Sequence, residues 1–449
     1  MKYEEFKKRV IEAAEAEGLK DYELYYRSSE DMTVGTFRHE VNNFSSSTEG
    51  GVCFRTLTGG QMGYASTEDL SESEAVEIVR RAKANAAVLE SAEEQFLGEA
   101  GGVYEQPERK AMELPTTEEM VRTALLGQDA AYAADQRVID GTSSEVIRST
   151  QRIAIYNSRG LDLQQENSAV VFLSAPVVSD GKEMNNTYEI HPGALSELDI
   201  QEVVGKAVES AVRKLGADVA PTGAYPVIFA PKAMAGLLAT FSSAFSAEAA
   251  PKGLSLLGGK EGQVIASEKV TLTDDPFYAE SLMPMPFDAE GMPTRKKNVI
   301  EKGVFTTLLH NLKTAAVAGV RTTGNASKSG YAGTVGVSPF TLLLVPGDLT
   351  EEELLAKAGN GVWIDSLQGM HAGANPISGD FSLQSGGFMI ENGQKTKPVK
   401  AFTVAGNFYE LLKNVEALSD KAETGGFGAG ITSFAAPAVL VGGLSVAGK

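Results

Sequence analysis

From Ala220-Pro221 onward, the chain alternates short apolar segments with glycines, and this pattern limits what the second half can fold into. Thirty of the 47 glycines in the 449-residue chain lie after residue 220. Segments such as FTLLLVPG and VKAFTVAGN have the length of single strands, and the glycines between them permit tight turns. We therefore expect residues 220–449 to form one glycine-rich, largely antiparallel, barrel-like domain that carries a few helices.

The residues before this point repeat a different order, in which a helix, several strands and a second helix follow one another. The first set spans residues 1–90 and the second spans residues 116–219, with helix-start signals at Ser71 and Thr116. Residues 91–115 are acidic and interrupted by Gly and Pro, which is typical of a linker. The pattern predicts an α+β chain with two N-terminal helix–meander–helix modules, built on antiparallel or mixed sheets.

The charge of the chain is unevenly distributed and argues against some classes of partner. The formal net charge is −19 at pH 7, and −17 of it falls on residues 1–220. A chain this acidic is repelled by phosphate backbones and anionic lipids, so we expect no nucleic-acid and no membrane partner. The N-terminal sequence predicts an acidic amphipathic helix rather than a signal peptide, and no apolar run is long enough to span a bilayer. We therefore expect a cytoplasmic protein.

A search for catalytic and metal-binding motifs finds none. The four histidines are too far apart in the sequence to form a helical pair of zinc ligands. The single cysteine, Cys53, lies within a predicted strand and excludes both internal disulfides and multi-cysteine metal sites. Asp274 and Asp275 are adjacent on a strand, where side chains point to opposite faces, so turn capping is favoured over a pair that shares a proton. The glycines of GGFGAG at 425–430 match neither a phosphate-binding nor a dinucleotide-binding motif.

Two glycine-rich loops, at 322–330 and 373–381, leave two interpretations open. Gly and Asn readily adopt left-handed backbone, so these loops suit tight turns beside a ligand or a partner strand. The same composition also suits simple links between short strands. His371 precedes the second loop and is a candidate to face a cleft.

Several of these segments follow the order that is found in one known family. The loop TTGNASKSG at 322–330, the stretch GANPISGDFSLQSGGFMIENGQKTKPVKAFTVAGNFYELLKNVEAL at 373–418 and the closing AAPAVLVGGLSVAGK resemble the carboxyl-terminal domain of the TldD/PmbA family. The two preceding modules fit the N-terminal and central domains of that family. The resemblance therefore covers nearly the whole chain.

The family contains two kinds of subunit, and the resemblance implies which kind this chain is. TldD-type chains carry an H-E-x-x-x-H helix that binds zinc, with a cysteine of the C-terminal domain as a further ligand, whereas PmbA-type (TldE) chains lack this motif. In the matching helix, at 236–248, Thr240, Phe241 and Phe245 replace the first histidine, the glutamate and the second histidine. Glu248 remains, but no cysteine follows residue 220. The resemblance implies a PmbA-type pseudoenzyme without catalytic residues or a metal of its own, and zinc is expected only in a TldD-type partner.

The resemblance also implies a function. In this family, TldD and PmbA subunits form a cytoplasmic protease that cleaves unfolded or extended peptides, in the maturation of a modified peptide antibiotic and the degradation of an antitoxin. A PmbA-type chain would form part of the chamber and of the peptide groove in a heterodimer with a TldD-type subunit. An extended peptide can add to a strand edge through main-chain hydrogen bonds. The candidate substrate-binding residues, in or beside the two glycine-rich loops, are Gly324, Asn325, His371, Asn375, Gly379 and Asp380.

Two alternative functions remain open. The first is a stand-alone homodimer that binds peptides without cleaving them. The second is a metal-independent hydrolase with Thr240, Ser242 or Ser243 as its nucleophile, although no base partner is evident. The older description of the family as modulators of DNA gyrase would require contact with DNA or with gyrase, and the net charge of −19 disfavours contact with DNA.

Overall fold

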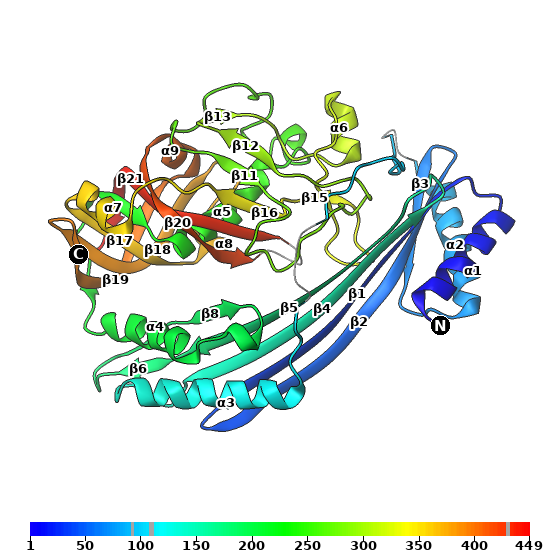
Figure 1. Cartoon of the computed structure of the whole chain (residues 1–449). Helices are drawn as coiled ribbons and strands as arrows, with labels where there is room; N and C mark the ends of the chain where they lie inside the picture. Colours follow the sequence, from blue (N-terminus) through cyan, green and yellow to red (C-terminus); the bar gives the residue numbers. More distant parts are fainter. Residues whose placement is uncertain (91–93, 107–111, 428–431) are drawn as a thin grey trace.

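The computed structural model describes residues 1–90, 94–106, 112–427 and 432–449. Part of the predicted linker 91–115 and part of the GGFGAG segment therefore lie outside the described residues. The described parts form an α+β structure, in which a long curved sheet has helices at both ends and the C-terminal domain lies over it (Figure 1).

The elements before residue 220 include four α-helices and nine strands among the described residues. They are α1 (Tyr3–Ala16), β1 (Asp21–Phe37), β2 (Glu40–Thr58), β3 (Gln61–Thr67), α2 (Glu72–Val88), α3 (Thr117–Ala134), β4 (Ser143–Asn157), β5 (Asp162–Ala175), β6 (Val177–Ser179), β7 (Met184–Asn186), β8 (Glu189–Pro192), the 3-10 turn η1 (Leu195–Glu197), α4 (Ile200–Arg213) and β9 (Asp218–Val219).

The two N-terminal modules share one antiparallel sheet of six strands within the described residues, in the order β3-β2-β1-β4-β5-β8. β1 pairs with β2 of its own module along one side and with β4 of the second module along the other. In β1, residues Asp21 to Phe37 pair with β2, and residues Glu23 to Gly35 pair with β4. The modules therefore do not have separate sheets, and the chain between them returns to the sheet it left.

Helices cover the two ends of this sheet (Figure 1). α1 and α2 pack on one end, around the fully buried side chains of Phe6, Leu24 and Ile78. α3 and α4 pack on the other end, around Met120 and Phe172. Burial of these apolar side chains accounts for the positions of the four helices.

The C-terminal domain contains the remaining elements. They are β10 (Gly223–Phe229), α5 (Pro231–Phe241), the 3-10 turns η2 (Ser242–Phe245) and η3 (Ala250–Lys252), β11 (Leu272–Asp274), β12 (Lys297–Glu301), β13 (Val304–Phe305), α6 (Leu312–Ala318), β14 (Ala326–Ser327), β15 (Gly336–Val337), β16 (Thr341–Leu344), α7 (Glu351–Ala358), β17 (Gly361–Gln368), α8 (Met370–Gly373), β18 (Asp380–Glu391), β19 (Gln394–Asn407), α9 (Phe408–Lys413), β20 (Val415–Phe427) and β21 (Ser433–Ala447).

The sheet of this domain is largely antiparallel but not purely so. Its described strands follow the order β13-β12-β11-β16-β21-β10-β17-β18-β19-β9, with β20 beside β21. The pairs β10–β17, β16–β21 and β19–β9 are parallel. β19 also pairs with β21 over Thr403–Ala405, which joins β21, β10, β17, β18 and β19 in a ring. The other strands lie outside this ring, so the predicted barrel-like closure of the domain is not confirmed.

The C-terminal domain rests on the long sheet through a small apolar core. Tyr25 of β1 and Cys53 of β2 pack there with Met285 and Phe287. Leu24, the neighbour of Tyr25, belongs instead to the core beneath α1 and α2, because successive side chains of a strand point to opposite faces. One strand therefore contacts helices on one face and the C-terminal domain on the other.

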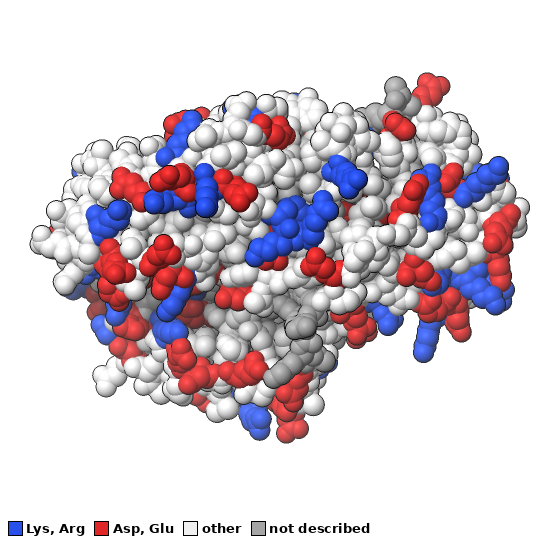
Figure 2. Space-filling view, turned by 45° about the horizontal axis from the view of Figure 1, so that its top comes forward, with Lys and Arg blue, Asp and Glu red and all other residues white. Residues whose placement is uncertain are grey.

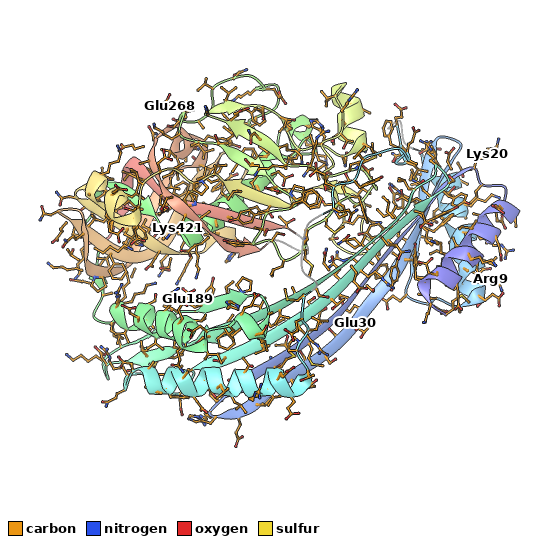
Figure 3. The ribbon with its side chains drawn as sticks, in the orientation of Figure 1. Arg9, Lys20, Glu30, Glu189, Glu268 and Lys421 are labelled. Atoms are coloured by element: carbon orange, nitrogen blue, oxygen red, sulfur yellow. The ribbon has the colours of Figure 1, made fainter. Side chains whose placement is uncertain are left out.

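An ion pair provides a second contact between the two halves. Lys232 of α5 lies 2.7 Å from Glu189 of β8, and Glu189 is labelled in Figure 3. On the face shown in Figure 2, basic and acidic side chains are interspersed. No described helix has both the length and the apolar composition needed to cross a membrane.

Candidate functional site

The resemblance aligns α5 with the zinc-binding helix of TldD-type chains, and α5 is shorter than the sequence pattern predicts. The pattern predicts a helix over 232–250, whereas α5 ends at Phe241 and continues as the 3-10 turn η2. The Ser242 hydroxyl donates to the carbonyl oxygen of Ala239 at 2.9 Å, a local bond that competes with regular helix geometry. Thr240 and Phe245 therefore do not lie on one continuous α-helix.

The side chains at the three motif positions do not fit a zinc site. Phe241 is completely buried and stacks on Phe408, with 4.6 Å between the ring centroids. Phe245 is also completely buried. A phenyl ring has no lone pair to donate to zinc, whereas a catalytic zinc takes about three N, O or S ligands from the protein. The hydroxyl of Thr240 is the one heteroatom in this set of side chains, and it donates to the carbonyl oxygen of Gly236 at 2.9 Å.

The acidic residue that follows these positions is engaged elsewhere. Glu248 forms an ion pair with Lys252 at 2.9 Å, four residues further along the chain. Across the described parts of the chain, no three His, Cys, Asp or Glu side chains are grouped so that they could hold a metal ion. The donor set around α5 therefore differs from that of a catalytic zinc centre.

Thr240 nevertheless lines a cavity of about 540 Å³ between α5 and the long sheet. On the sheet side the cavity is lined by Tyr25 and Arg27 of β1 and by Ile153 of β4. Arg27 and Ile153 are cross-strand partners, and Tyr25 lies two residues before Arg27, so all three face the same side of the sheet. On the other side the cavity is lined by the end of α5 and by Lys328, which follows β14.

A second cavity, of about 270 Å³, adjoins the first. The two share Ser242 and Ser338 in their walls. β14 and β15 form a short antiparallel ribbon beside both, with Ser327 lining the first cavity and Val337 the second. The two cavities thus follow the same ribbon past the end of α5.

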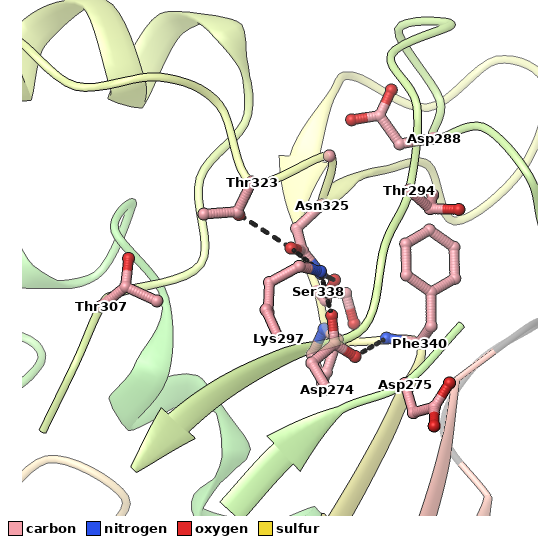
Figure 4. A network of polar contacts seen from close by, with 12 residues as sticks. Asp274, Asp275, Asp288, Thr294, Lys297, Thr307, Thr323, Asn325, Ser338 and Phe340 are labelled. Carbon is pink, nitrogen blue, oxygen red and sulfur yellow. Dashed lines mark hydrogen bonds and ion pairs between the residues drawn. The ribbon is translucent and has the colours of Figure 1, made fainter. Parts of the chain in front are cut away.

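One predicted substrate-binding residue, Asn325, is buried within a polar network (Figure 4). Its amide nitrogen donates to Asp274 at 2.7 Å and to the Ser338 carbonyl oxygen at 3.1 Å. Its amide oxygen accepts from Lys297 at 3.0 Å. Asp274 also accepts from the backbone N–H of Phe340, at 2.7 Å. Asn325 and Asp274 therefore hold neighbouring segments of the C-terminal domain together.

The two predicted glycines are required by the backbone. Gly324 has a φ of +69°, and a Cβ atom there would lie 2.4 Å from the carbonyl oxygen of Pro293. Gly379 has a φ of +85°, and a Cβ atom there would lie 2.5 Å from the ring of Tyr409. Any larger residue would strain the fold at both positions. A loss of binding on substitution of either glycine could therefore result from loss of stability alone.

The other predicted residues, around the loop 373–381, line neither cavity. His371 is exposed on α8. Asn375 accepts from the backbone N–H of Ile377 at 2.9 Å, which is a local turn contact. Asp380 accepts from Asn407 at 2.9 Å, and hydrogen bonds of this kind lower the pKa of its carboxyl group. A role of these residues in substrate binding stays a prediction.

The charged residues of the larger cavity, Arg27, Lys328 and Asp288, were not found by sequence reasoning. Lys328 belongs to the loop TTGNASKSG, four residues after Gly324, and is the one charged residue of that loop. A lone lysine among Gly, Ser and Asn is a signal that could have been used. Arg27 lies on β1 two residues after the core residue Tyr25, and this alternation places an arginine on an inward face.

Two buried carboxyl groups lie in the segment that closes the cavity. Asp288 accepts from the backbone N–H groups of Glu290 and Ala326, both at 2.9 Å, and burial raises its pKa. Burial also raises the pKa of Glu290, whose side chain accepts from the N–H of Leu312 at 2.8 Å. Main-chain N–H groups therefore position both carboxyl groups, while desolvation disfavours their charged forms.

A buried ion pair on the sheet lies next to these groups. Arg55 donates to Glu23 at 2.8 Å across β1 and β2, and both side chains are almost completely buried. Burial lowers the pKa of the Lys328 ammonium, with the Cys53 thiol and the Arg55 guanidinium as neighbours. The cavity is therefore bordered by charged groups that are largely removed from water.

Comparison with known proteins places the whole chain in one family. Three family models match in succession: "PmbA/TldA metallopeptidase domain 1" over residues 22–86, "PmbA/TldA metallopeptidase central domain" over 112–215, and "PmbA/TldA metallopeptidase C-terminal domain" over 222–448.

Individual relatives agree with these matches. A protein named metalloprotease from Methanothermobacter thermautotrophicus is 30% identical over 311 residues, which are 67% of each chain. The metalloprotease PmbA homolog of Haemophilus influenzae is 27% identical over 401 residues, which are 87% of this chain and 86% of the relative.

Solved structures give the same result. A putative modulator of a DNA gyrase from Thermotoga maritima matches with a TM-score of 0.89 and 30% identity, over 99% of this chain and 100% of the other. TldE from Thermococcus kodakarensis matches with a TM-score of 0.89 and 25% identity over the same shares. With domain models matched along its length and a shared fold throughout, the chain belongs to the TldD/PmbA family.

Proposed function

We propose that this chain is a non-catalytic, TldE-like subunit of a TldD/TldE-type metalloprotease that cleaves unfolded or extended peptides in the cytoplasm. The end of α5 carries the proposal. Thr240 lines the 540 Å³ cavity there, while Phe241 and Phe245 occupy the apolar core where zinc chemistry would need a carboxylate and an imidazole. The metal and the water-activating carboxylate would then belong to a TldD-type partner.

The two adjoining cavities support an extended peptide as the ligand. They follow the β14–β15 ribbon, and short ribbons can accept a further strand through main-chain hydrogen bonds. Such binding reads backbone rather than side chains, so it tolerates many sequences. It also excludes folded proteins, whose backbone groups are already paired.

The geometry gives little support to a serine or threonine hydrolase. The hydroxyls of Thr240 and Ser242 donate to the carbonyl oxygens of Gly236 and Ala239, each at 2.9 Å. A nucleophilic hydroxyl needs a neighbouring base that accepts its proton, and these two are committed to main-chain oxygens. The stand-alone peptide-binding homodimer remains the outcome to expect if no zinc-bearing partner exists.

Reconstitution of activity tests the proposal. The purified chain, the TldD-type subunit of its host and a mixture of both are assayed with a fluorogenic, unfolded peptide and zinc. We expect no turnover by this chain alone and turnover by the mixture, which a chelator abolishes. Turnover by this chain alone that survives the chelator and is lost in Ser242→Ala or Thr240→Val would contradict the proposal and favour the hydrolase.

A further inference from the structure

Two cationic side chains from different halves of the molecule meet at the larger cavity. Arg27 comes from β1, and Lys328 from the loop after β14. Arg27 donates to the carbonyl oxygens of Lys328 and Ser329, at 3.4 and 3.3 Å, which holds this loop against the sheet. The Lys328 ammonium lies 4.3 Å from the centre of the Tyr25 ring, so both cations lie over the same stretch of β1.

Neither cation has a carboxylate partner among the described residues. The carboxylate in the cavity wall, Asp288, has its oxygens on backbone N–H groups, with Glu290 and Met292 donating to one and Ala326 to the other. Arg55 of β2, a neighbour of Lys328, is paired with Glu23. The cavity wall therefore carries two cationic side chains without a direct ion-pair partner among the described residues, although the Glu23 carboxylate also favours the charged form of Lys328.

An unpaired ammonium next to apolar surface costs free energy, because desolvation disfavours the charged form. Met285 and Phe287 line the same cavity as Lys328, and burial lowers the pKa of its ammonium. Arg27 adds a planar guanidinium, which suits two-point hydrogen bonding to a carboxylate. An anionic group that enters the cavity would relieve the cost that the free chain bears.

We propose that this cavity binds a carboxylate group of an extended peptide, with Lys328 and Arg27 as its cationic partners. The inference rests on the proposed function, which makes an extended peptide the ligand of the chain. A peptide that follows the β14–β15 ribbon from the smaller cavity passes Ser338 and Ser242 before it reaches Lys328. The end of such a path suits the C-terminal carboxylate of the peptide, and an acidic side chain offers the same chemistry.

Fluorescence anisotropy with the full-length chain tests this assignment. The probes are N-terminally labelled tetra-alanine as the free acid, the same peptide as its C-terminal amide, and an amide in which one residue is glutamate. We expect the free acid to bind about 10-fold tighter than the plain amide, as a charge-assisted pair implies. Binding of the glutamate amide instead of the free acid would assign the site to an acidic side chain and still support it.

Variants test whether the preference for the free acid arises in the cavity or from the overall charge of the protein. Lys328→Met and Arg27→Gln should each remove most of the difference between acid and amide, while Lys357→Met, at an exposed position on α7, should leave it unchanged. Thermal unfolding of each variant checks that it is folded, and Lys328→Met should be no less stable than the parent because it removes a desolvated charge.

Equal binding of all three peptides by the parent chain would overturn the inference, as would an undiminished preference for the carboxylate-bearing peptide in folded Lys328→Met. Competition by inorganic phosphate as strong as by acetate would also overturn it, since the site would then be a general anion site. If the carboxylate site is disproved but the chain still pairs with a zinc-bearing subunit, the proposed function is still supported. Failure to find that subunit leaves the binding result standing.

Discussion

At the scale of single residues, the boundary between the two halves is notable for ionisable groups that are removed from water. Glu290 and Asp288 are buried with raised pKa values, and the Glu23–Arg55 pair lies next to them. Such groups contribute to stability in a way that depends on pH, because folding changes their affinity for protons.

Glu290 gives the clearest prediction of this kind. Burial raises the pKa of its carboxyl group to about 8, against about 4.3 in an unfolded chain. Between these values the folded state holds a proton that the unfolded state has lost, so stability falls as the pH rises through this window. Glu290→Gln should flatten this dependence, by up to about 1.4 kcal/mol per pH unit.

The measurement is urea unfolding followed by circular dichroism at pH 5, 6, 7 and 8. Glu268→Gln is the matched control, because the Glu268 side chain is 84% exposed (Figure 3). Parallel stability curves for Glu290→Gln and the parent chain would show that Glu290 does not titrate as described.

The resemblance assigns Thr240, Phe241 and Phe245 to the positions of the zinc motif by their fixed spacing, and this assignment stays a prediction. Their environments could not be predicted, since the end of α5 at Phe241 depends on local hydrogen bonds that spacing does not reveal. The contact between Arg27 and Lys328 joins residues 301 positions apart, and a single sequence carries no signal for it.

At the scale of elements, the helices follow their capping signals closely. Thr116 accepts from the N–H of Glu119, and Glu119 returns a bond to Thr116, as the capping-box sequence predicts. Ser71 accepts from the N–H of Glu74 at the start of α2, and Ala75, Ile78 and Val79 are buried as the helical periodicity predicts. Local hydrogen bonds and one apolar face suffice to define these helices.

The long strands were predicted only in pieces. The pattern predicts strands over 22–29 and 32–39, whereas β1 is one strand that passes through Glu30 and Asp31. The pattern likewise misses the exposed, polar first half of β2, which pairs with β1 from Glu40 onward. Apolar alternation fails there because main-chain pairing between β1 and β2 continues where the side chains of β2 are exposed.

Two glycine substitutions test how closely an element packs. A Cβ atom on Gly63 of β3 would lie 2.0 Å from the carbonyl oxygen of Ala82 in α2. Gly63→Ala should therefore destabilise the chain by about 3 kcal/mol, because α2 must move away from the sheet. Gly205→Ala, within α4 and with no atom near the new Cβ, should instead stabilise by about 0.5 to 1 kcal/mol.

Urea denaturation midpoints of the two variants and the parent provide the test. Opposite shifts are expected, since both changes add the same methyl group and differ only in its surroundings. A Gly63→Ala variant as stable as the parent would mean that β3 and α2 are not in the close contact described.

At the scale of the whole molecule, the candidate site lies between the two halves. The larger cavity takes walls from β1, β4, α5 and the loop after β14, and no one domain encloses it. Two units of different composition could be expected from sequence, with −17 of the charge in the first and most glycines in the second. That the first two modules share one sheet, and that this sheet forms one side of the cavity, depends on long-range contacts that composition does not encode.

We propose that this chain is the subunit without zinc in a two-subunit protease. Native mass spectrometry with metal analysis, on the protein purified from its own host, tests it most directly. We expect a complex with a second chain that carries H-E-x-x-x-H, with about one zinc for each such pair of chains. A metal-free assembly of this chain alone, with no such companion, would contradict the account and favour a stand-alone peptide-binding protein.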